Sequence, residues 1–340
     1  MQSPSSSRQN RLLQEETARS LWYSGVGHAE IREEPLREAG PGEVRVRALY
    51  SAISRGTEGL VYAGRVPPSE YQRMRAPFMA GTFPFPVKYG YASVGRVERG
   101  PAELVGRVVF ALYPHQTRFT LPAEALALVP DRVPAARAVL AANMETALNA
   151  VWDAAPGPAD RIAVIGAGVV GALVGWMCGR LPGTQVTLID VDPSRAELAR
   201  LLGIAFSAPE EAPQDCDLVF HASGTAAGLT TALNCAGDEA TIVEMSWYGS
   251  DEVRVPLGGA FHSRRLKLIS SQVGKIGAAH HARWTHGRRL AAALDLLADP
   301  ALDALIAPAL DFGDLPARLP DIFAPASGVL CQLVRYPAAE

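Results

Sequence analysis

The stretch from Arg161 to Asp190 constrains the fold of this chain more than any other part of its sequence. It consists of an apolar run, a glycine-rich turn, an uncharged segment of helical length and a second β-rich run, RIAVIGAGVVGALVGWMCGRLPGTQVTLID. The turn at 166–171 has the pattern G-x-G-x-x-G, and an acid follows about 20 residues later. Such glycines allow a tight turn, close approach of a pyrophosphate and close helix–strand packing. The stretch therefore predicts a strand–helix–strand unit that binds a dinucleotide.

The same motif indicates which residues would hold the cofactor. Free N–H groups and the positive end of the helix would bind the diphosphate. Asp190 would accept hydrogen bonds from the adenosine ribose and repel a 2′-phosphate. NAD(H) is therefore expected in preference to NADP(H), although Arg195 lies within reach of such a phosphate. The expected contacts at the turn are Gly166, Gly168, Val169, Val170 and Gly171.

Two other interpretations of this stretch are open. Residues 162–179 contain no charge and are long enough to span a membrane. Glycines interrupt that run, however, and a strand-like segment opens it. The second alternative is a glycine-rich turn that binds nothing. Asp190 argues against it, because the acid stands where a ribose diol needs an acceptor, and we expect dinucleotide binding.

The composition limits the classes of function. The chain has 340 residues, enough for two domains, with 48% apolar residues, 20% charged residues and a net charge of −3. Because there is no basic block, neither a nucleic acid nor a membrane is expected as a partner. The N-terminus lacks the apolar segment of a secretory signal. The scattered cysteines predict core thiols of a cytoplasmic protein, and neither a disulfide frame nor a zinc cluster. They are Cys178, Cys216, Cys235 and Cys331.

Hydrophobic periodicity divides the chain into segments. Short β-like runs separated by turns are typical of an antiparallel, barrel-like unit, and they give way to an alanine-rich helical segment at 135–155. Strand and helix patterns then alternate, as in a doubly wound parallel α/β sheet. The expected divisions are a disordered extension 1–19, a β-rich catalytic domain 20–150, a nucleotide-binding domain 151–285 and a C-terminal segment 286–340.

Several short segments occur in an order that resembles the medium-chain dehydrogenase/reductase family, the alcohol-dehydrogenase-like group. The resemblance covers nearly the whole chain after Ser20. It implies a Rossmann domain, a discontinuous, mostly β (GroES-like) catalytic domain completed by residues 286–340, an active-site cleft between them, and a homodimer. The segments match the family's P-G-E-V, C-G-T-D, G-H-E-x-x-G, T-A and A-S-G motifs in turn: Pro41-Gly42-Glu43-Val44, Ser54-Arg55-Gly56-Thr57-Glu58, Gly90-Tyr91-Ala92-Ser93-Val94-Gly95, Thr146-Ala147-Leu148 and Ala222-Ser223-Gly224.

The departures from the family pattern concern its metal. Members with catalytic zinc carry Cys and His at the C-G-T-D and G-H-E sites, where this chain has Arg55 and Tyr91. Neither is a usual zinc ligand, and no cysteine precedes Cys178 to form the family's four-cysteine zinc lobe. We therefore expect no zinc. The S-x-G-T-E and G-Y-x-S-V-G patterns resemble the zinc-lacking branch of bacteriochlorophyllide dehydrogenase, which would oxidise a secondary hydroxyethyl group with NAD.

Without zinc, protein donors must polarise the reacting oxygen. Tyr91 is the first candidate for that acid or donor, since it replaces a zinc ligand. The alternative is a buried tyrosine bonded to backbone. Lys88 would lower the pKa of Tyr91 if it points inward, and is otherwise a solvated loop charge. Thr57 stands where the family often places a hydroxyl proton relay, so the resemblance implies that role.

Three further side chains complete the catalytic candidates. Arg55 and Glu58 flank Thr57 and either contribute to the site or pair with each other. His115 ends a β-run near the expected cleft, where its pKa range suits a proton shuttle. The alternative for His115 is an exposed loop histidine.

Residues that end the later strands are expected to line the nicotinamide half of the cofactor. His221 would flank the cofactor, and Trp247–Tyr248 would wall the substrate pocket. The match to the family's T-A segment adds one helical residue to the expected cofactor contacts. The set is Thr146, Ser223, Gly224, Met245 and Ser246.

These observations favour a zinc-independent, NAD-dependent oxidoreductase that transfers hydride between nicotinamide and a small alcohol or carbonyl substrate. Two alternatives stay open. One is a reductase of an activated C=C or C=N bond in a biosynthetic pathway. The other is a nucleotide-binding protein that has lost catalysis.

Overall fold

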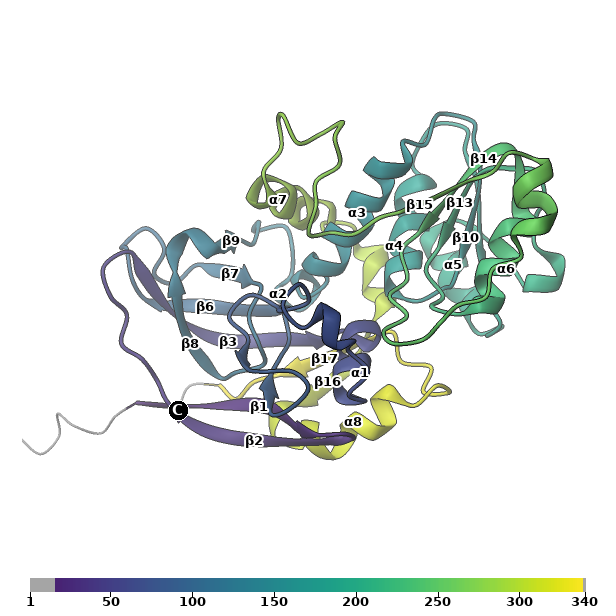
Figure 1. Cartoon of the computed structure of the whole chain (residues 1–340). Coiled ribbons are helices and arrows are strands. Elements are labelled where there is room, and N and C mark those ends of the chain that lie inside the picture. Colours follow the sequence, from purple (N-terminus) through teal and green to yellow (C-terminus); the bar gives the residue numbers. More distant parts are fainter. Residues whose placement is uncertain (1–15, 339–340) are drawn as a thin grey trace, which may run out of the picture.

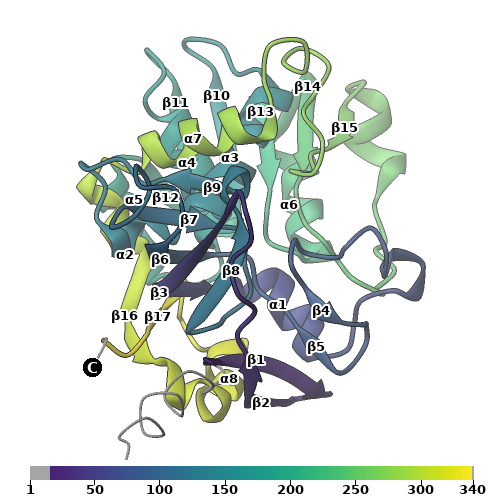
Figure 2. The same ribbon diagram turned by 90° about the vertical axis from the view of Figure 1, so that its left-hand side faces the viewer.

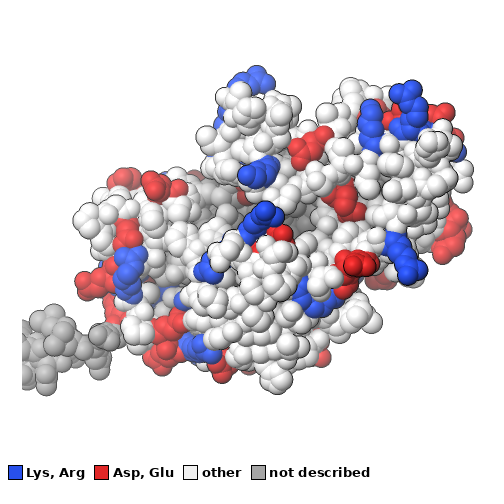
Figure 3. All heavy atoms as spheres, in the orientation of Figure 1, with Lys and Arg blue, Asp and Glu red and all other residues white. Residues whose placement is uncertain are grey.

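The computed structural model describes residues 16–338 and has two parts (Figure 1). One part is built on a parallel sheet, drawn in teal and green, and the other on mainly antiparallel sheets drawn in purple, blue and yellow. On the face shown in Figure 3, basic and acidic side chains are interspersed and no large patch of one sign is present. Within residues 16–338, none of the helices has both the length and the apolarity needed to cross a membrane.

The first part is a six-stranded sheet in which every neighbouring pair is parallel, in the order β12-β11-β10-β13-β14-β15. Its central strands are almost wholly buried, as expected for a parallel sheet covered on both faces. This is the doubly wound Rossmann order, with its switch point between β10 and β13. The strands are β10 (Arg161–Ile165), β11 (Gln185–Ile189), β12 (Ala205–Ser207), β13 (Cys216–His221), β14 (Ala236–Glu244) and β15 (Lys267–Ser270).

Helices pack on this sheet where the apolar periodicity predicts them. The apolar helix α4 packs on β10 and β11, and α6 packs on β10, β13 and β14. Two further helices, α3 and α7, pack against each other, and α3 also packs on α4. The helices are α3 (Ala141–Ala154), α4 (Val169–Cys178), α5 (Arg195–Leu202), α6 (Ala226–Cys235) and α7 (His286–Leu296).

The second part contains a seven-stranded sheet and a four-stranded sheet. The C-terminal strands β16 and β17 join β3 of the N-terminal half, so this domain is discontinuous in sequence (Figure 2). The larger sheet has β3 (Glu43–Ile53), β6 (Ser93–Arg99), β7 (Val108–Ala111), β8 (Arg118–Pro122), β9 (Leu126–Leu128), β16 (Ile306–Asp311) and β17 (Cys331–Arg335). The smaller has β1 (Thr17–Gly25), β2 (His28–Pro35), β4 (Ala80–Gly81) and β5 (Val87–Lys88), and α8 (Leu315–Phe323) packs on β2.

Some elements differ from the sequence prediction. Within the part expected to form short β runs and turns, the segment after β3 contains the helix α1 (Arg55–Tyr62), whose two glycines weaken any helix signal in the sequence. The predicted helix 135–155 is divided into α2 (Ala135–Ala138) and α3 by two residues whose side chains are fully buried. Of the expected extension 1–19, residues 1–15 lie outside the described part, and Thr17 already begins β1.

The hydrophobic core runs through the junction of the two domains. One cluster joins residues of the larger β sheet, such as Val94 and Phe110, to the core of the parallel sheet around Val164. A second cluster fills the β domain. Tyr91 packs against both clusters. The two domains therefore share packed side chains, with Tyr91 at their boundary.

Candidate active site

The glycine-rich turn joins β10 to α4 at the carboxyl edge of the parallel sheet. Gly166 has a φ of +102°, and a Cβ there would lie 2.7 Å from the backbone nitrogen of Ser223. A Cβ on Gly171 would overlap the carbonyl oxygen of Gly166. At Gly168, which is exposed and caps α4, a Cβ would meet nothing within 4 Å. The fold itself therefore requires glycine at 166 and 171, whereas the open space over Gly168 suits a ligand that approaches the backbone.

Asp190 follows β11 and is fixed beside this turn. Its carboxylate accepts a hydrogen bond from the Ala167 N–H at 2.7 Å and another from the Asp192 N–H at 2.9 Å. The first turn of α4 presents amide groups that have no partner inside the helix. Such amides and an acid at the neighbouring strand end are the groups that a dinucleotide needs. The residues of this edge therefore fit that cofactor.

The residues expected at the nicotinamide half lie at the same edge, after β13 and β14. The N–H of Gly224 donates to Ser246 Oγ at 3.1 Å, which joins the two loops. Met245 is half-buried and packs against the core shared by the two domains. Thr146 is placed differently: its hydroxyl donates to the carbonyl oxygen of Ala142, one turn earlier in α3, at 2.9 Å. The proton of that hydroxyl is thus used within the helix.

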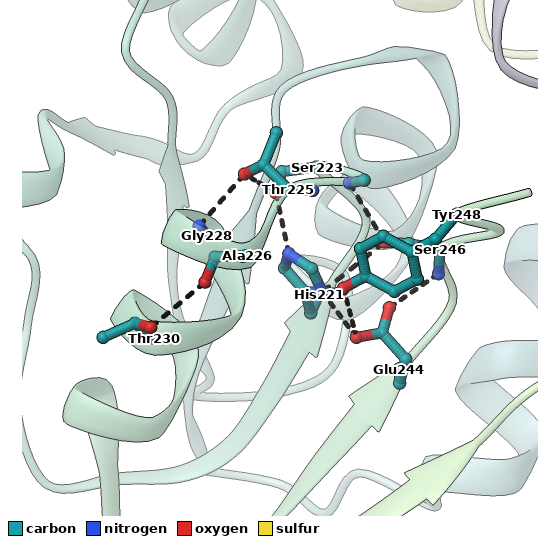
Figure 4. A network of polar contacts seen from close by, with 10 residues as sticks. His221, Ser223, Thr225, Ala226, Gly228, Thr230, Glu244, Ser246 and Tyr248 are labelled. Atoms are coloured by element: carbon teal, nitrogen blue, oxygen red, sulfur yellow. Dashed lines mark hydrogen bonds and ion pairs between the residues drawn. The ribbon is translucent and has the colours of Figure 1, made fainter. Parts of the chain in front are cut away.

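Beside these loops lies a polar cluster, which we call the His221–Glu244 cluster (Figure 4). The sequence indicated its other members separately, but neither Glu244 nor the contacts among them. The imidazole Nδ1 of His221 lies 2.7 Å from Glu244 Oε2, and its Nε2 lies 2.7 Å from Ser223 Oγ. Ser246 N–H and the Tyr248 hydroxyl also donate to Glu244, at 2.7 and 3.0 Å. The available signal was a polar residue at the end of each of two apolar strands. The cluster is defined as His221, Ser223, Glu244, Ser246 and Tyr248.

Tyr91 lies across the junction, on the side of the β domain. Its hydroxyl donates to Ser54 Oγ at 2.5 Å, and Thr57 is a second hydrogen-bonding neighbour. Burial raises the pKa of Tyr91 to about 12, although the bonds to Ser54 and Thr57 act in the opposite direction. The phenol is therefore protonated at neutral pH, and it is a donor at the boundary between the domains.

Behind Tyr91 the β domain holds a buried acid–histidine pair. Glu58 and His115 have no exposed surface, and His115 Nε2 lies 2.9 Å from Glu58 Oε2. Glu58 also accepts from the Tyr23 hydroxyl at 2.7 Å and from the Ser54 N–H at 2.8 Å. A Cβ on the residue before Tyr91, Gly90, would lie 2.7 Å from the His115 ring. The pair thus supports both Ser54 and the backbone next to Tyr91.

This arrangement brings together Tyr91, Thr57, Glu58 and His115 from the predicted catalytic set. It also corrects one of the alternatives given for His115 and one of those given for Glu58. His115 is not an exposed loop residue, since its ring is fully buried. Glu58 does not pair with Arg55, because its carboxylate is occupied by His115, Tyr23 and Ser54.

Two predicted residues lie apart from Tyr91. The guanidinium of Arg55 donates to the carbonyl oxygens of Ile322, Ala324 and Val329, and so ties α1 to the C-terminal segment. The prediction that Lys88 lowers the pKa of Tyr91 is wrong. The Lys88 ammonium contacts Glu34 at 2.7 Å and Gln116 at 2.9 Å, and Lys88 is not among the groups that shift the pKa of Tyr91.

The two aromatic residues expected to wall a substrate pocket, Trp247 and Tyr248, make different contacts. Trp247 packs against the core of the β domain, whereas Tyr248 donates to Glu244. The next residue, Gly249, approaches Arg65 of the β domain so closely that a Cβ would lie 2.7 Å from its carbonyl oxygen. The loop after β14 therefore connects the cofactor edge to the β domain.

The side chains at the family's metal positions do not fit a zinc ion. Arg55 is engaged with carbonyl groups and Tyr91 is a protonated phenol, as described above. Over residues 16–338, no group of three or more His, Cys, Asp and Glu side chains is arranged to hold a metal. The four cysteines are buried and unpaired thiols.

Several solved structures share this architecture. L-idonate 5-dehydrogenase from Escherichia coli matches with a TM-score of 0.77 at 15% identity, over 94% of this chain and 98% of that chain. For 2R,3R-butanediol dehydrogenase from Bacillus subtilis the TM-score is 0.75 at 16% identity, over 94% and 100%. Acetophenone reductase from Geotrichum candidum, solved in complex with NAD, matches with a TM-score of 0.74 at 17% identity, over 94% and 97%.

The fold is that of the medium-chain dehydrogenases/reductases. It combines a Rossmann sheet with a discontinuous GroES-like β domain, as the order of motifs in the sequence implies. No family model matches the sequence, and no curated protein matches it significantly. At these identities the likeness concerns the fold, so the chemistry has to be argued from the residues.

Proposed function

We propose that this protein is an NAD(H)-dependent oxidoreductase that transfers hydride between nicotinamide and an alcohol or carbonyl substrate without zinc. One observation carries the proposal. A glycine turn with open space over Gly168, and with Asp190 fixed beside it, lies at the same domain junction as the protonated Tyr91. A site for a dinucleotide and a proton donor for the reacting oxygen thus occur together.

The choice of NAD(H) over NADP(H) follows from the charges near the ribose position. Asp190 places a carboxylate where a 2′-phosphate would bring more negative charge. Arg195 is the cation that the sequence indicated within reach of such a phosphate. Its guanidinium lies 3.3 Å from the Asp192 carboxylate and donates to the Gly328 carbonyl oxygen at 3.0 Å. Because those contacts occupy its guanidinium, we expect NADP(H) to bind more weakly than NAD(H).

Tyr91 supplies the proton chemistry in this proposal. A bound nicotinamide would give or take the hydride at the substrate carbon. In carbonyl reduction the Tyr91 hydroxyl, neutral because burial raises its pKa to about 12, donates to the developing alkoxide. Ser54 and Thr57 hydroxyls next to Tyr91 offer a route by which its proton is replaced. The buried Glu58–His115 pair positions Ser54.

The finer parts of the proposal rest on the sequence motifs. They include zinc independence, the resemblance to the bacteriochlorophyllide dehydrogenase branch with its secondary hydroxyethyl substrate, and a cytoplasmic location. A homodimer through an edge of the parallel sheet, where β12 and β15 are the outermost strands among residues 16–338, is part of the proposal because the family resemblance implies it. The domain divisions 20–150, 151–285 and 286–340 belong to the same proposal.

Turnover by the purified full chain tests this function. The chain is assayed with NAD⁺ or NADH against secondary alcohols, ketones and enones, beside Tyr91→Phe and the matched control Tyr89→Phe. Tyr89 lies two residues before the proposed donor, and its hydroxyl donates to the backbone carbonyl oxygen of Met74 at 3.3 Å. We expect Tyr91→Phe to lower kcat/KM for an alcohol or ketone by roughly 100-fold or more, and Tyr89→Phe to stay near wild type.

Each other outcome of this assay identifies the part that is wrong. Unchanged turnover by Tyr91→Phe removes Tyr91 from the chemistry. Turnover of enones alone favours the C=C reductase, and cofactor binding without any turnover favours the inactive nucleotide-binding protein. Stoichiometric zinc in the active sample overturns zinc independence.

A further inference from the structure

The His221–Glu244 cluster is placed at the edge where a dinucleotide would lie. His221 pairs in register with Ile165, the last residue before Gly166, and Glu244 pairs with His221 on the next strand. The backbone of Ser223 limits the space at Gly166. The cluster and the glycine turn are therefore direct neighbours.

The order of the strands shows which half of the cofactor faces the cluster. Asp190 follows β11, on one side of β10, and marks the adenosine half. The strands β13 and β14 lie on the other side of β10, where the second mononucleotide half of a Rossmann domain binds its ligand. The cluster therefore borders the nicotinamide half.

The contacts of Glu244 indicate that it is ionised. It accepts from Ser246 N–H and from the Tyr248 hydroxyl, and it faces His221 Nδ1. Burial acts to raise the pKa of Glu244, but its contacts with His221 and its hydrogen bonds from Ser246 hold the pKa below its ordinary value. Over residues 16–338, no Lys or Arg forms an ion pair with this carboxylate. Its charge is balanced only if His221 is protonated.

Two hydroxyl groups connect His221 Nε2 to the start of α6. Ser223 Oγ lies 2.7 Å from His221 Nε2 and 3.0 Å from Thr225 Oγ1, which accepts from the Gly228 N–H at 3.0 Å. If Thr225 donates to Ser223 and Ser223 donates to Nε2, every hydroxyl proton has a protein acceptor, and Nδ1–H points to Glu244. In this arrangement the imidazole is neutral, and the cluster carries the single negative charge of Glu244.

We propose that the His221–Glu244 cluster supplies a fixed negative charge that makes the site bind the oxidised, cationic nicotinamide more tightly than the neutral reduced form. The inference rests on the proposed function, since it requires a nicotinamide dinucleotide on the glycine turn. The two forms differ by one positive charge on the ring, so a carboxylate at this edge attracts only the oxidised form. At equal concentrations of both forms, the enzyme would be loaded for alcohol oxidation.

The test is the ratio of the NADH and NAD⁺ dissociation constants, measured by calorimetry on the full chain. Glu244→Gln removes the charge and keeps the size of the side chain. Glu239→Gln is the matched control, because Glu239 lies on the same strand, away from its carboxyl end, and pairs with exposed Arg265. We expect Glu244→Gln to reduce the preference for NAD⁺ roughly tenfold, the scale of one charge acting over about 12 Å at an effective dielectric constant of about 20. Glu239→Gln should leave the ratio unchanged.

A second variant separates charge from geometry. Tyr248→Phe removes a donor to Glu244 but leaves the carboxylate, so the preference for NAD⁺ should persist even if both affinities fall. An unchanged ratio in folded Glu244→Gln, or a ratio that collapses in Tyr248→Phe, overturns the proposed charge effect. If the wild type binds neither form, the proposed function fails with it, and this outcome is distinct from a changed ratio.

Discussion

The protein contains two acid–histidine pairs that make the same kinds of hydrogen bonds, and the two pairs differ in their exposure to solvent. In each, a tyrosine hydroxyl and a serine N–H donate to the acid, one imidazole nitrogen faces the acid, and a serine hydroxyl meets the other nitrogen. The two sets are Glu58, His115, Tyr23, Ser54 and Ser51, and Glu244, His221, Tyr248, Ser246 and Ser223.

Exposure separates the roles of the two pairs. Glu58 and His115 are fully enclosed in the β domain, where they hold α1 and the segment before Tyr91 together. The Glu244 side chain keeps 15% of its surface exposed at the ends of two parallel strands. The enclosed pair therefore acts on the fold, whereas the open pair can also act on a ligand.

The largest expected difference between the pairs is in stability. Glu58→Ala would leave His115, the Tyr23 hydroxyl and the Ser54 N–H without their shared acceptor in a buried place, at a cost of about 3–5 kcal/mol in the free energy of unfolding. Glu244→Ala should cost less, about 1 kcal/mol, since Glu244 and two of its partners, Ser246 and Tyr248, are partly exposed to water. Denaturant unfolding of the two variants measures this difference. Equal losses of unfolding free energy would show that the two pairs contribute equally to stability.

Replacing the tyrosine of each pair, Tyr23 or Tyr248, should change stability by a smaller amount than replacing the acid. Tyr23→Phe removes a buried donor at 2.7 Å from Glu58 and should cost roughly 1–2 kcal/mol, while NADH affinity is unchanged. Tyr248→Phe should cost less than about 1 kcal/mol and weaken NADH binding. Thermal unfolding and NADH titration of both variants provide the two readouts. An affinity loss confined to Tyr23→Phe would reverse the assignment of roles.

The smallest expected effect is the pH dependence of the open pair. The pKa of Glu244 is held below its ordinary value in the folded state, as derived above. Its carboxylate therefore stabilises the fold above the ordinary carboxyl pKa, and this contribution is lost as the pH falls through the lower folded pKa. The difference in unfolding free energy between wild type and Glu244→Gln should be at most about 1 kcal/mol at neutral pH and vanish in acid. A difference that grows towards low pH contradicts this sign.

The cofactor half of the site could be predicted from sequence because backbone geometry determines it. Gly166 and Gly171 are required by close contacts within the turn, and Asp190 follows the next strand of a regular sheet. These features have short, fixed spacing along the chain. In the same half, the alternation of strand and helix patterns predicts a doubly wound parallel sheet.

The part of the site in the β domain depends on contacts between residues that are distant in sequence, and no local sequence pattern predicts such contacts. Glu58 meets residues 35 and 57 positions away, and Ser51 bonds Tyr336 across 285 positions. Lys88 was misplaced because its partner Glu34 comes from another strand. The sequence could name Tyr91, Thr57 and Glu58 as candidates, but their geometry needed the fold.

The most direct test of the account is the affinity of Gly168→Ala for NADH, measured by calorimetry beside denaturant unfolding. An added Cβ at this position meets no protein atom within 4 Å, so the unfolding free energy should change by less than about 1 kcal/mol. A dinucleotide lying over the turn would meet that methyl group, and we predict that the NADH dissociation constant rises by roughly tenfold or more. Unchanged NADH affinity in the folded variant would contradict the placement of the cofactor on this turn.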